Sequence, residues 1–176
     1  MQVKKRDGTL EDLNVEKLHK VVMYACEGIA GVSASEVEIN SKIQFFDSIA
    51  TEDIQETLIK SAADLISEET PNYQYVAGRL INYHLRKMVY DSFTPPCLCD
   101  IIQDNIDAGF YDAEFTELYT KTEIDELNSH IKHDRDEVLT YAAMEQFRGK
   151  YLVQNRSTGE IFETPQVAYM MIAATL

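Results

Sequence analysis

The sequence predicts an α+β fold that is mostly helical, and three features of the chain support that class. Near the N-terminus, Asp7-Gly8 separates two short extended segments, and such a pair indicates a β-hairpin because glycine tolerates the positive φ of a tight turn. Apolar residues then recur at helical spacing in four successive segments, up to about Tyr90. Further along, residues 151–163 surround a Ser-Thr-Gly turn and predict one more hairpin.

Four helices are expected after the first hairpin. The first follows Asn14, which is a good N-cap residue, and the second follows one of two Ser-x-x-Glu capping boxes and extends to about Phe45. Thr51 is expected to cap the third, and Thr70-Pro71 to open the fourth, since proline fits the first helical turn. The apolar face predicted for the third helix consists of Ile54, Leu58, Ala62, Leu65 and Ile66.

Pro95-Pro96 interrupts the helical pattern and predicts a boundary between two domains, residues 1–92 and 93–176. The second part is expected to hold a helix from Leu98, another from Thr122 to Asp136, and a last helix, Gln166–Leu176, which Thr164-Pro165 starts. That last helix is almost wholly apolar after its first turn. A helix of this kind needs a covering partner, so we expect the second domain to be incomplete.

Charge and composition narrow the classes of function. The formal net charge of the chain is −14, which disfavours binding to a long nucleic acid. No apolar run reaches the length of about 18 residues that a membrane helix needs, and no secretory signal follows the charged N-terminus, so no membrane association is expected. The three cysteines lack zinc-site spacing, and reduced thiols fit a cytoplasmic protein.

Cations are concentrated at the N-terminus of this acidic chain. Residues 1–20 contain five Lys/Arg and four Asp/Glu, including Lys5 and Arg6 in the hairpin and Lys17 in the first turn of a helix. Free backbone N–H groups and the helix dipole favour anions at that turn, so a nucleoside triphosphate is a suitable ligand. The alternative is a solvated basic edge strand that prevents aggregation. The chain has neither a Walker glycine loop nor a Rossmann fingerprint.

His130 and His133, followed by Asp134, have the spacing of metal ligands on one helix face. A polar network at a helix end, with Arg135 bridging carboxylates, is the favoured interpretation because no further ligands lie nearby in the sequence. We therefore expect no metal site. No serine or cysteine has the surroundings of a catalytic nucleophile, so no catalytic residue is expected.

Several of these segments together resemble the ATP-cone module and, more narrowly, the N-terminus of the large subunit of class I ribonucleotide reductase. In the first domain they are Val3-Lys4-Lys5-Arg6-Asp7-Gly8, Asn14-x-x-Lys17-Leu18, Thr51-x-x-Ile54 and Pro71-Asn72-Tyr73-Gln74-Tyr75-Val76-Ala77-x-Arg79-Leu80. In the second they are His133-Asp134-Arg135-Asp136, Tyr141-Ala142-Ala143 and Gly149-Lys150-Tyr151-Leu152-Val153-Gln154-Asn155-Arg156 with Gly159-Glu160-Ile161. The resemblance implies a cone of one hairpin and a four-helix bundle, followed by the helical start of the catalytic domain with one hairpin.

The resemblance also implies that the cone binds ATP or dATP, with Mg²⁺, as an allosteric effector. The family's binding positions fall on Val3, Lys5, Arg6, Glu11, Asn14, Lys17, Leu18, Thr51, Ile54, Gln55, His84 and Lys87. The cationic side chains and His84 would meet the phosphates, Glu11 and Asn14 would meet the base or polar groups of the hairpin, and Val3, Leu18 and Ile54 would enclose the adenine. Many relatives that dATP inhibits strongly have histidine where this chain has Gln55, so the resemblance leaves dATP inhibition open.

For the whole enzyme, the resemblance implies reduction of ribonucleotides for DNA synthesis, with no catalytic cofactor held by this chain. The implied partners are the remainder of the large subunit, the small radical-bearing subunit and further copies of the large subunit. Two alternatives remain at this point. One is a non-enzymatic sensor, such as a cone-containing transcriptional regulator, and the other is a helical interaction domain that binds no nucleotide.

Overall fold

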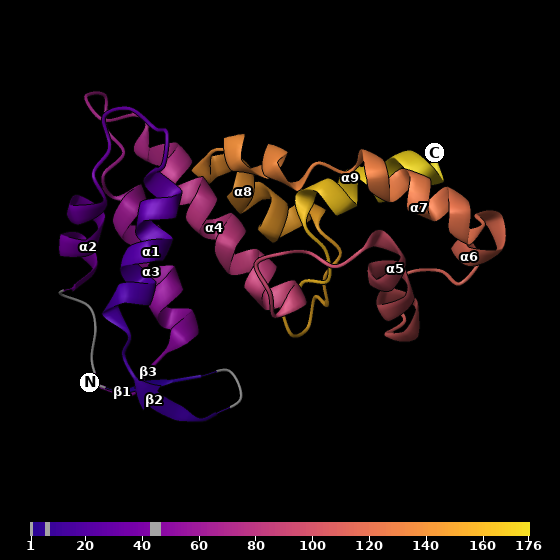
Figure 1. Ribbon diagram of the computed structural model, residues 1–176, viewed down its shortest axis with the longest axis horizontal. Helices are drawn as coiled ribbons and strands as arrows, with labels where there is room; N and C mark the ends of the chain where they lie inside the picture. Colours follow the sequence, from indigo (N-terminus) through magenta and orange to yellow (C-terminus); the bar gives the residue numbers. More distant parts are fainter. Residues whose placement is uncertain (1, 6–7, 43–46) are drawn as a thin grey trace. The chain divides into compact units, whose positions relative to one another are not determined.

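The computed structural model describes residues 2–5, 8–42 and 47–176, which form a mostly helical α+β structure with one small sheet (Figure 1). These residues fall into two compact units. The first comprises Met1–His84 with Glu137–Glu145, and the second comprises Leu85–Asp136 with Gln146–Leu176. This spatial division differs from the division at residue 92 expected from the sequence, and the latter stays a prediction.

The N-terminal hairpin is confirmed and belongs to a three-stranded sheet in the order β2-β1-β3. Strands β1 (Gln2–Lys4) and β2 (Leu10–Asp12) are antiparallel, and the Lys5 backbone N–H donates to the Thr9 carbonyl at 2.8 Å. Gly8 has a φ of +84°, as the turn requires, whereas Asp7 lies outside the described residues. The third strand, β3 (Ile49–Ala50), is parallel to β1 and was not predicted, because two residues carry no periodicity.

Four helices complete the first unit and confirm the expected series. They are α1 (Val15–Cys26), α2 (Ala34–Lys42), α3 (Thr51–Ala63) and the beginning of α4 (Tyr73–Tyr90). The predicted extension of the second helix to Phe45 falls outside the described residues. Asn14 caps α1 as predicted, since its side chain accepts a hydrogen bond from the Lys17 backbone N–H at 3.0 Å.

Two details of α3 were wrong in the prediction. Thr51 is the first helical residue, and Ala50 occupies the N-cap position without a side-chain hydrogen bond. At the other end the helix stops at Ala63, and Leu65 and Ile66 follow it in tight turns that bond to carbonyls three residues back. These two side chains therefore do not continue the helical apolar face, and Ile66 is exposed.

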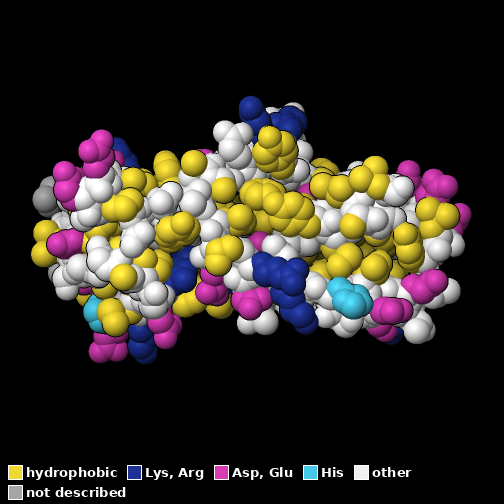
Figure 2. Space-filling model, turned by 90° about the horizontal axis from the view of Figure 1, so that it is seen from above, with side chains coloured by type: hydrophobic (Ala, Val, Ile, Leu, Met, Phe, Trp, Pro, Cys, Tyr) yellow, Lys and Arg dark blue, Asp and Glu magenta, His cyan; other side chains and the backbone are white. Residues whose placement is uncertain are grey.

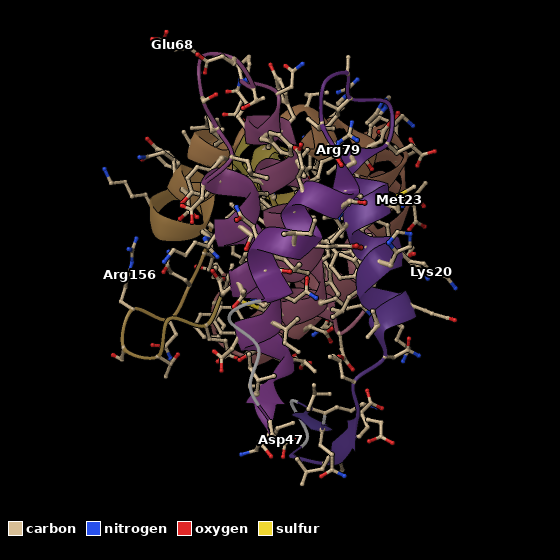
Figure 3. All side chains as sticks on the ribbon, turned by 90° about the vertical axis from the view of Figure 1, so that its left-hand side faces the viewer. Lys20, Met23, Asp47, Glu68, Arg79 and Arg156 are labelled. Carbon is tan, nitrogen blue, oxygen red and sulfur yellow. The ribbon has the colours of Figure 1, made fainter. Side chains whose placement is uncertain are left out.

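Helix α4 packs closely within the first unit. Arg79 donates to the Glu27 carbonyl at the end of α1, at 2.6 Å, and to the Glu137 carbonyl at 3.2 Å (Figure 3). A Cβ atom at Gly78 would lie only 2.2 Å from the Leu139 carbonyl oxygen, so glycine permits this close approach of the two backbones. By contrast, Lys20 and Met23 project from α1 into solvent (Figure 3).

The remaining elements are α5 (Leu98–Asp107), α6 (Phe115–Leu118), α7 (Lys121–His130), the 3₁₀ helix η1 (His133–Val138), α8 (Tyr141–Gln146), the π-helical turn η2 (Phe147–Tyr151) and α9 (Pro165–Thr175). The single helix predicted over 122–136 was wrong. Thr120 caps α7 in a capping box, the helix ends at His130, and extended Ile131 separates it from η1.

The second predicted hairpin is reduced to one antiparallel bridge between Gln154 and Ile161. The Asn155 side chain accepts hydrogen bonds from the Ser157 and Thr158 backbone N–H groups and so closes the turn. Outside the turn, η2 occupies the residues that would have extended one strand. The turn was therefore predicted correctly, but the strands were not.

On the face shown in Figure 2, acidic side chains are widely spread, whereas lysine and arginine gather in a few places. This distribution agrees with the net charge of −14. Within the described residues, no helix has both the length and the apolar character required to cross a membrane.

Candidate nucleotide-binding pocket

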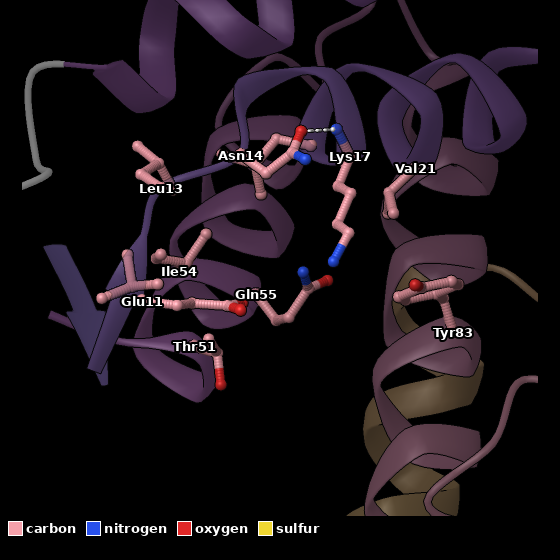
Figure 4. Close-up of a pocket in the computed structure, with 11 residues that line it drawn as sticks. Glu11, Leu13, Asn14, Lys17, Val21, Thr51, Ile54, Gln55 and Tyr83 are labelled. Atoms are coloured by element: carbon pink, nitrogen blue, oxygen red, sulfur yellow. Dashed lines mark hydrogen bonds between the residues drawn. The ribbon is translucent and has the colours of Figure 1, made fainter. Parts of the chain in front are cut away.

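A pocket of about 150 Å³ lies where the sheet meets the first turns of two helices (Figure 4). Its walls come from β1, β2 and the turn after it, α1, α3 and α4. The lining residues are Val3, Glu11, Leu13, Asn14, Lys17, Leu18, Val21, Thr51, Ile54, Gln55 and Tyr83. The short strands thus bring the N-terminal ends of α1 and α3 together, although Asn14 and Thr51 are 37 positions apart in the sequence.

Both helix ends are suited to an anionic ligand. Asn14 and Lys17 belong to the N-cap and first turn of α1, and Thr51 and Ile54 belong to the first turn of α3. The first N–H groups of a helix have no intrahelical acceptor and carry the positive end of the helix dipole. On α3, the N-cap residue is Ala50, whose side chain makes no capping hydrogen bond. Two such ends at one pocket favour a phosphate or carboxylate group.

Two lysines and one acid provide the charge at this site. The exposed Lys17 side chain extends toward the Gln55 amide (Figure 4). Lys5, next to the pocket, lies 2.7 Å from the Glu11 carboxylate, and both side chains are partly exposed. The pocket therefore combines a cation with an acceptor that can bind an amino group.

The inner wall of the pocket is apolar. Val3 and Ile54 are only 3% and 2% exposed, and Leu13, Leu18 and Val21 extend the same surface. Val3 lies opposite Glu11 in the β1–β2 register and opposite Ile49 in the β1–β3 register, which holds its side chain between the strands and α3. A flat aromatic base is the kind of ligand that such a wall binds.

Gln55 contributes a polar atom without a partner. Its Oε1 atom is buried and forms no hydrogen bond within the described part of the chain, although the side chain lines the pocket. A buried acceptor left unpaired is costly, by about 1–3 kcal/mol, and a donor on a ligand would remove that cost. The side chain lies between Thr51 and Lys17 in the close-up view (Figure 4).

The pocket contains eight of the twelve residues predicted from the resemblance: Val3, Glu11, Asn14, Lys17, Leu18, Thr51, Ile54 and Gln55. Lys5 is not a lining residue, but it forms an ion pair with Glu11, which is one. Arg6 lies outside the described residues. Lys87 is on α4 in the second compact unit and is not a lining residue.

His84 is not brought to the pocket either. Its side chain is 3% exposed, and its Nε2 atom lies 3.5 Å from the Glu56 carboxylate. The reason is helical geometry, because Tyr83 takes the pocket-facing position and the next residue points about 100° away around the helix. Sequence reasoning missed Tyr83, Leu13 and Val21. Leu13, Val21 and Tyr83 have apolar or aromatic side chains, and nothing in the sequence distinguishes such a residue in a pocket wall from one in the core.

The cluster of His130, His133, Asp134 and Arg135 also differs from the prediction. His130 ends α7 and His133 begins η1, so the two do not share a helix face. Arg86, rather than Arg135, approaches the buried Asp136 carboxylate, at 3.9 Å, and donates to the His133 carbonyl at 2.5 Å. Burial raises the pKa of Asp136 to about 6 and lowers the pKa of His133. Among the described residues, no group of three or more His, Cys, Asp or Glu side chains could hold a metal ion.

Residues 1–88 match the model of the ATP cone domain, and this segment contains every lining residue of the pocket. The chain belongs to the ATP-cone family. Since the match extends over the hairpin and all four helices of the first unit, the family assignment agrees with the observed fold.

The similarity continues beyond the cone. The chain is 51% identical over 174 residues to ribonucleoside-diphosphate reductase 1 subunit alpha of Escherichia coli, 48% identical over 176 residues to the alpha subunit of Haemophilus influenzae, and 42% identical over 176 residues to that of Enterobacteria phage T4. These matches cover 99–100% of this chain and 23% of each relative. The chain therefore spans about a quarter of the length of the relatives it matches.

Proposed function

We propose that this ATP-cone chain is the regulatory N-terminal part of a ribonucleoside-diphosphate reductase large subunit and that the pocket binds ATP or dATP as an allosteric effector. The observation that carries the proposal is the convergence of two helix N-termini, Lys17 and an apolar wall on one pocket within the segment that matches the family. The similarity over residues 89–176 supports a reductase rather than a cone-containing regulator.

The pocket suggests how the nucleotide would bind. Its volume is smaller than the roughly 300–1,000 Å³ typical of pockets for whole drug-sized ligands, so the enclosed part suits one end of the molecule. The base would lie against Val3, Leu18 and Ile54. The phosphates, with Mg²⁺, would extend toward Lys17, Lys5 and the two helix ends. Glu11 could then accept a hydrogen bond from the amino group of adenine.

The reaction of the complete enzyme would be reduction of ribonucleotides to deoxyribonucleotides in the cytoplasm. Neither a catalytic residue nor a catalytic cofactor is assigned to this chain. The remainder of the large subunit would supply the chemistry, in an oligomer of large subunits that docks with the small radical-bearing subunit. The cone would change the activity of this assembly according to the nucleotide bound. The coupling free energy between two such sites is typically about 1–3 kcal/mol.

A reductase assay tests this division of roles. The chain alone, supplied with small subunit, dithiol and substrate, should form no deoxynucleotide. The completed large subunit should be active, and ATP should stimulate it. Lys17→Ala in the completed enzyme should reduce ATP stimulation without lowering the activity measured in the absence of effector. Deoxynucleotide formation by the chain alone, or stimulation unchanged by the substitution, would contradict the proposal.

A further inference from the structure

The segment Glu137–Glu145 belongs to the first compact unit, although the residues on both sides of it in the sequence belong to the second. It lies outside the residues 1–88 that match the ATP cone, and it contains the end of η1 and nearly all of α8. Peptide bonds join it to Asp136 before it and to Gln146 after it. A displacement of this segment within the first unit is therefore passed through the backbone to two points of the second unit.

Glu137 joins this segment to two helices of the cone. The Tyr24 hydroxyl of α1 donates to the Glu137 carboxylate at 2.7 Å, and the Arg79 guanidinium of α4 donates to the Glu137 carbonyl at 3.2 Å. Arg79 also donates to the carbonyl of Glu27, directly after α1, at 2.6 Å. All of these residues lie in the first unit. Tyr24, Arg79 and Glu137 are here called the Glu137 bridge.

The two helices that hold the Glu137 bridge also line the nucleotide pocket. On α1, Lys17 and Val21 line the pocket, and Tyr24 follows them by seven and three residues, which places it on the same face of the helix. On α4, Tyr83 lines the pocket and Arg79 lies one turn before it on the same face. Only about 10 Å of helix separates Lys17 from Tyr24.

A ligand that fills the pocket contacts both helices, so it fixes their spacing at that end. Helices are rigid over two turns, and a change in spacing at the pocket therefore reaches the bridge. Because Glu137 is bonded to α1 through its carboxylate and to α4 through its carbonyl, its position depends on both helices at once.

We propose that Glu137 is a positioning residue for regulation by the nucleotide, and that the Glu137 bridge passes the occupancy of the pocket to the segment Glu137–Glu145. The proposal rests on the proposed function, since it names the route by which that same pocket acts on the rest of the chain. Coupling between two sites is reciprocal, so the closed bridge favours nucleotide binding by the same factor by which the nucleotide favours the closed bridge.

Hydrogen exchange measured by mass spectrometry, with and without saturating MgATP, tests the proposal in this chain. Tyr24→Phe and Glu137→Ala remove the hydrogen bond between α1 and the segment, whereas Glu137→Gln keeps an acceptor for the Tyr24 hydroxyl without the charge. Tyr119→Phe is the matched control, because it removes one tyrosine hydroxyl bond in the second unit, to the Ala174 carbonyl at 2.6 Å. Circular dichroism checks that each variant folds, and calorimetry gives its Kd for ATP.

MgATP should slow exchange in residues 137–145 at least about fivefold in the wild type, Glu137→Gln and Tyr119→Phe, but less than about twofold in Tyr24→Phe and Glu137→Ala. Exchange in residues 51–55, which include lining residues of the pocket, should be slowed in every protein. Because the coupling is reciprocal, the Kd of Tyr24→Phe and Glu137→Ala should rise by no more than the factor by which ATP slows exchange at 137–145 in the wild type.

Unchanged exchange at 137–145 in a wild type that binds ATP would overturn this proposal and leave the nucleotide pocket unaffected. Full slowing in Tyr24→Phe and Glu137→Ala would also overturn it, since the segment would then respond without the bridge. So would a larger rise in the Kd of these two variants, because that result would mean that the residues hold the pocket itself. Absence of ATP binding in the wild type would instead contradict the proposed function, and this inference would fall with it.

Discussion

Lys17→Ala is the substitution that most sharply tests the phosphate contacts at the pocket. Lys17 lies in the first turn of α1, directly after the Asn14 cap, and lines the pocket. A charge-assisted hydrogen bond contributes about 1.5–3 kcal/mol. Because the Lys17 side chain is exposed, solvent and salt screen it and the lower end of that range applies. A loss of about 1.4 kcal/mol is tenfold in affinity, so the Kd for ATP should rise about tenfold.

The same substitution should leave the folded state intact without nucleotide. A lysine at the positive end of a helix dipole is unfavourable by a few tenths of a kcal/mol, and alanine is a better helix former. The thermal unfolding temperature of Lys17→Ala without ligand should therefore stay the same or rise slightly. Affinity lost without loss of stability is the result that distinguishes a binding residue from a structural one.

Lys20→Ala provides the matched control for calorimetry with MgATP at physiological ionic strength. It removes the same charge from the same helix, but Lys20 does not line the pocket and projects into solvent (Figure 3). Its effect on the Kd should be less than about twofold, as expected for a distant, screened charge. Unchanged affinity for Lys17→Ala, or an equal loss for Lys20→Ala, would refute the assignment of Lys17 to the phosphates.

Three further outcomes follow from the structure. Gly78→Ala should lower the free energy of unfolding by at least about 1–3 kcal/mol, since the added Cβ would lie 2.2 Å from the Leu139 carbonyl oxygen. An unchanged midpoint of chemical denaturation would contradict that contact. Ionised Asp136 is disfavoured in the fold because burial raises its pKa from 3.8 to about 6. The free energy of unfolding of the wild type, relative to that of Asp136→Asn, should therefore rise by about 2 kcal/mol as the pH falls from 7 to 4. Parallel pH profiles of the two proteins would exclude this. In the completed enzyme, saturating dATP should leave more than about half of the ATP-stimulated activity, because the neutral amide of Gln55 cannot add the charge of a protonated imidazole. Gln55→His should restore inhibition by dATP. Full inhibition of the unmodified enzyme would show that Gln55 is sufficient for inhibition by dATP.

The sequence allowed most helices to be predicted because their signals are local. Asn14 caps α1 and Pro165 is the first residue of α9, as their types predict. The fourth helix is also present, but it begins at Tyr73, so Pro71 lies in the turn before it and not in its first turn. The errors arose where tertiary contacts determine the secondary structure. Strand β3 exists only because Ile49 pairs with Val3, and the helix predicted over 122–136 breaks at Ile131.

The pocket residues could likewise be predicted only in part. Its charged and capping residues could be predicted because the resemblance identifies motif positions such as Lys17 and Thr51. Which face of α4 meets the pocket depends on the exact rotation of that helix. The prediction assigned His84, but the structure presents Tyr83 and buries His84 against α3. A shift of one residue on a helix exchanges a pocket residue for a core residue.

Calorimetric titration of this chain with MgATP, compared with MgGTP, measures whether the pocket is a site for an adenine nucleotide. We expect saturable binding of ATP and at least about tenfold weaker binding of GTP, because guanine presents a carbonyl acceptor where adenine offers an amino donor to Glu11. Absence of saturable ATP binding up to millimolar concentration, or equal affinity for the two nucleotides, would contradict the assignment of this pocket to an adenine nucleotide.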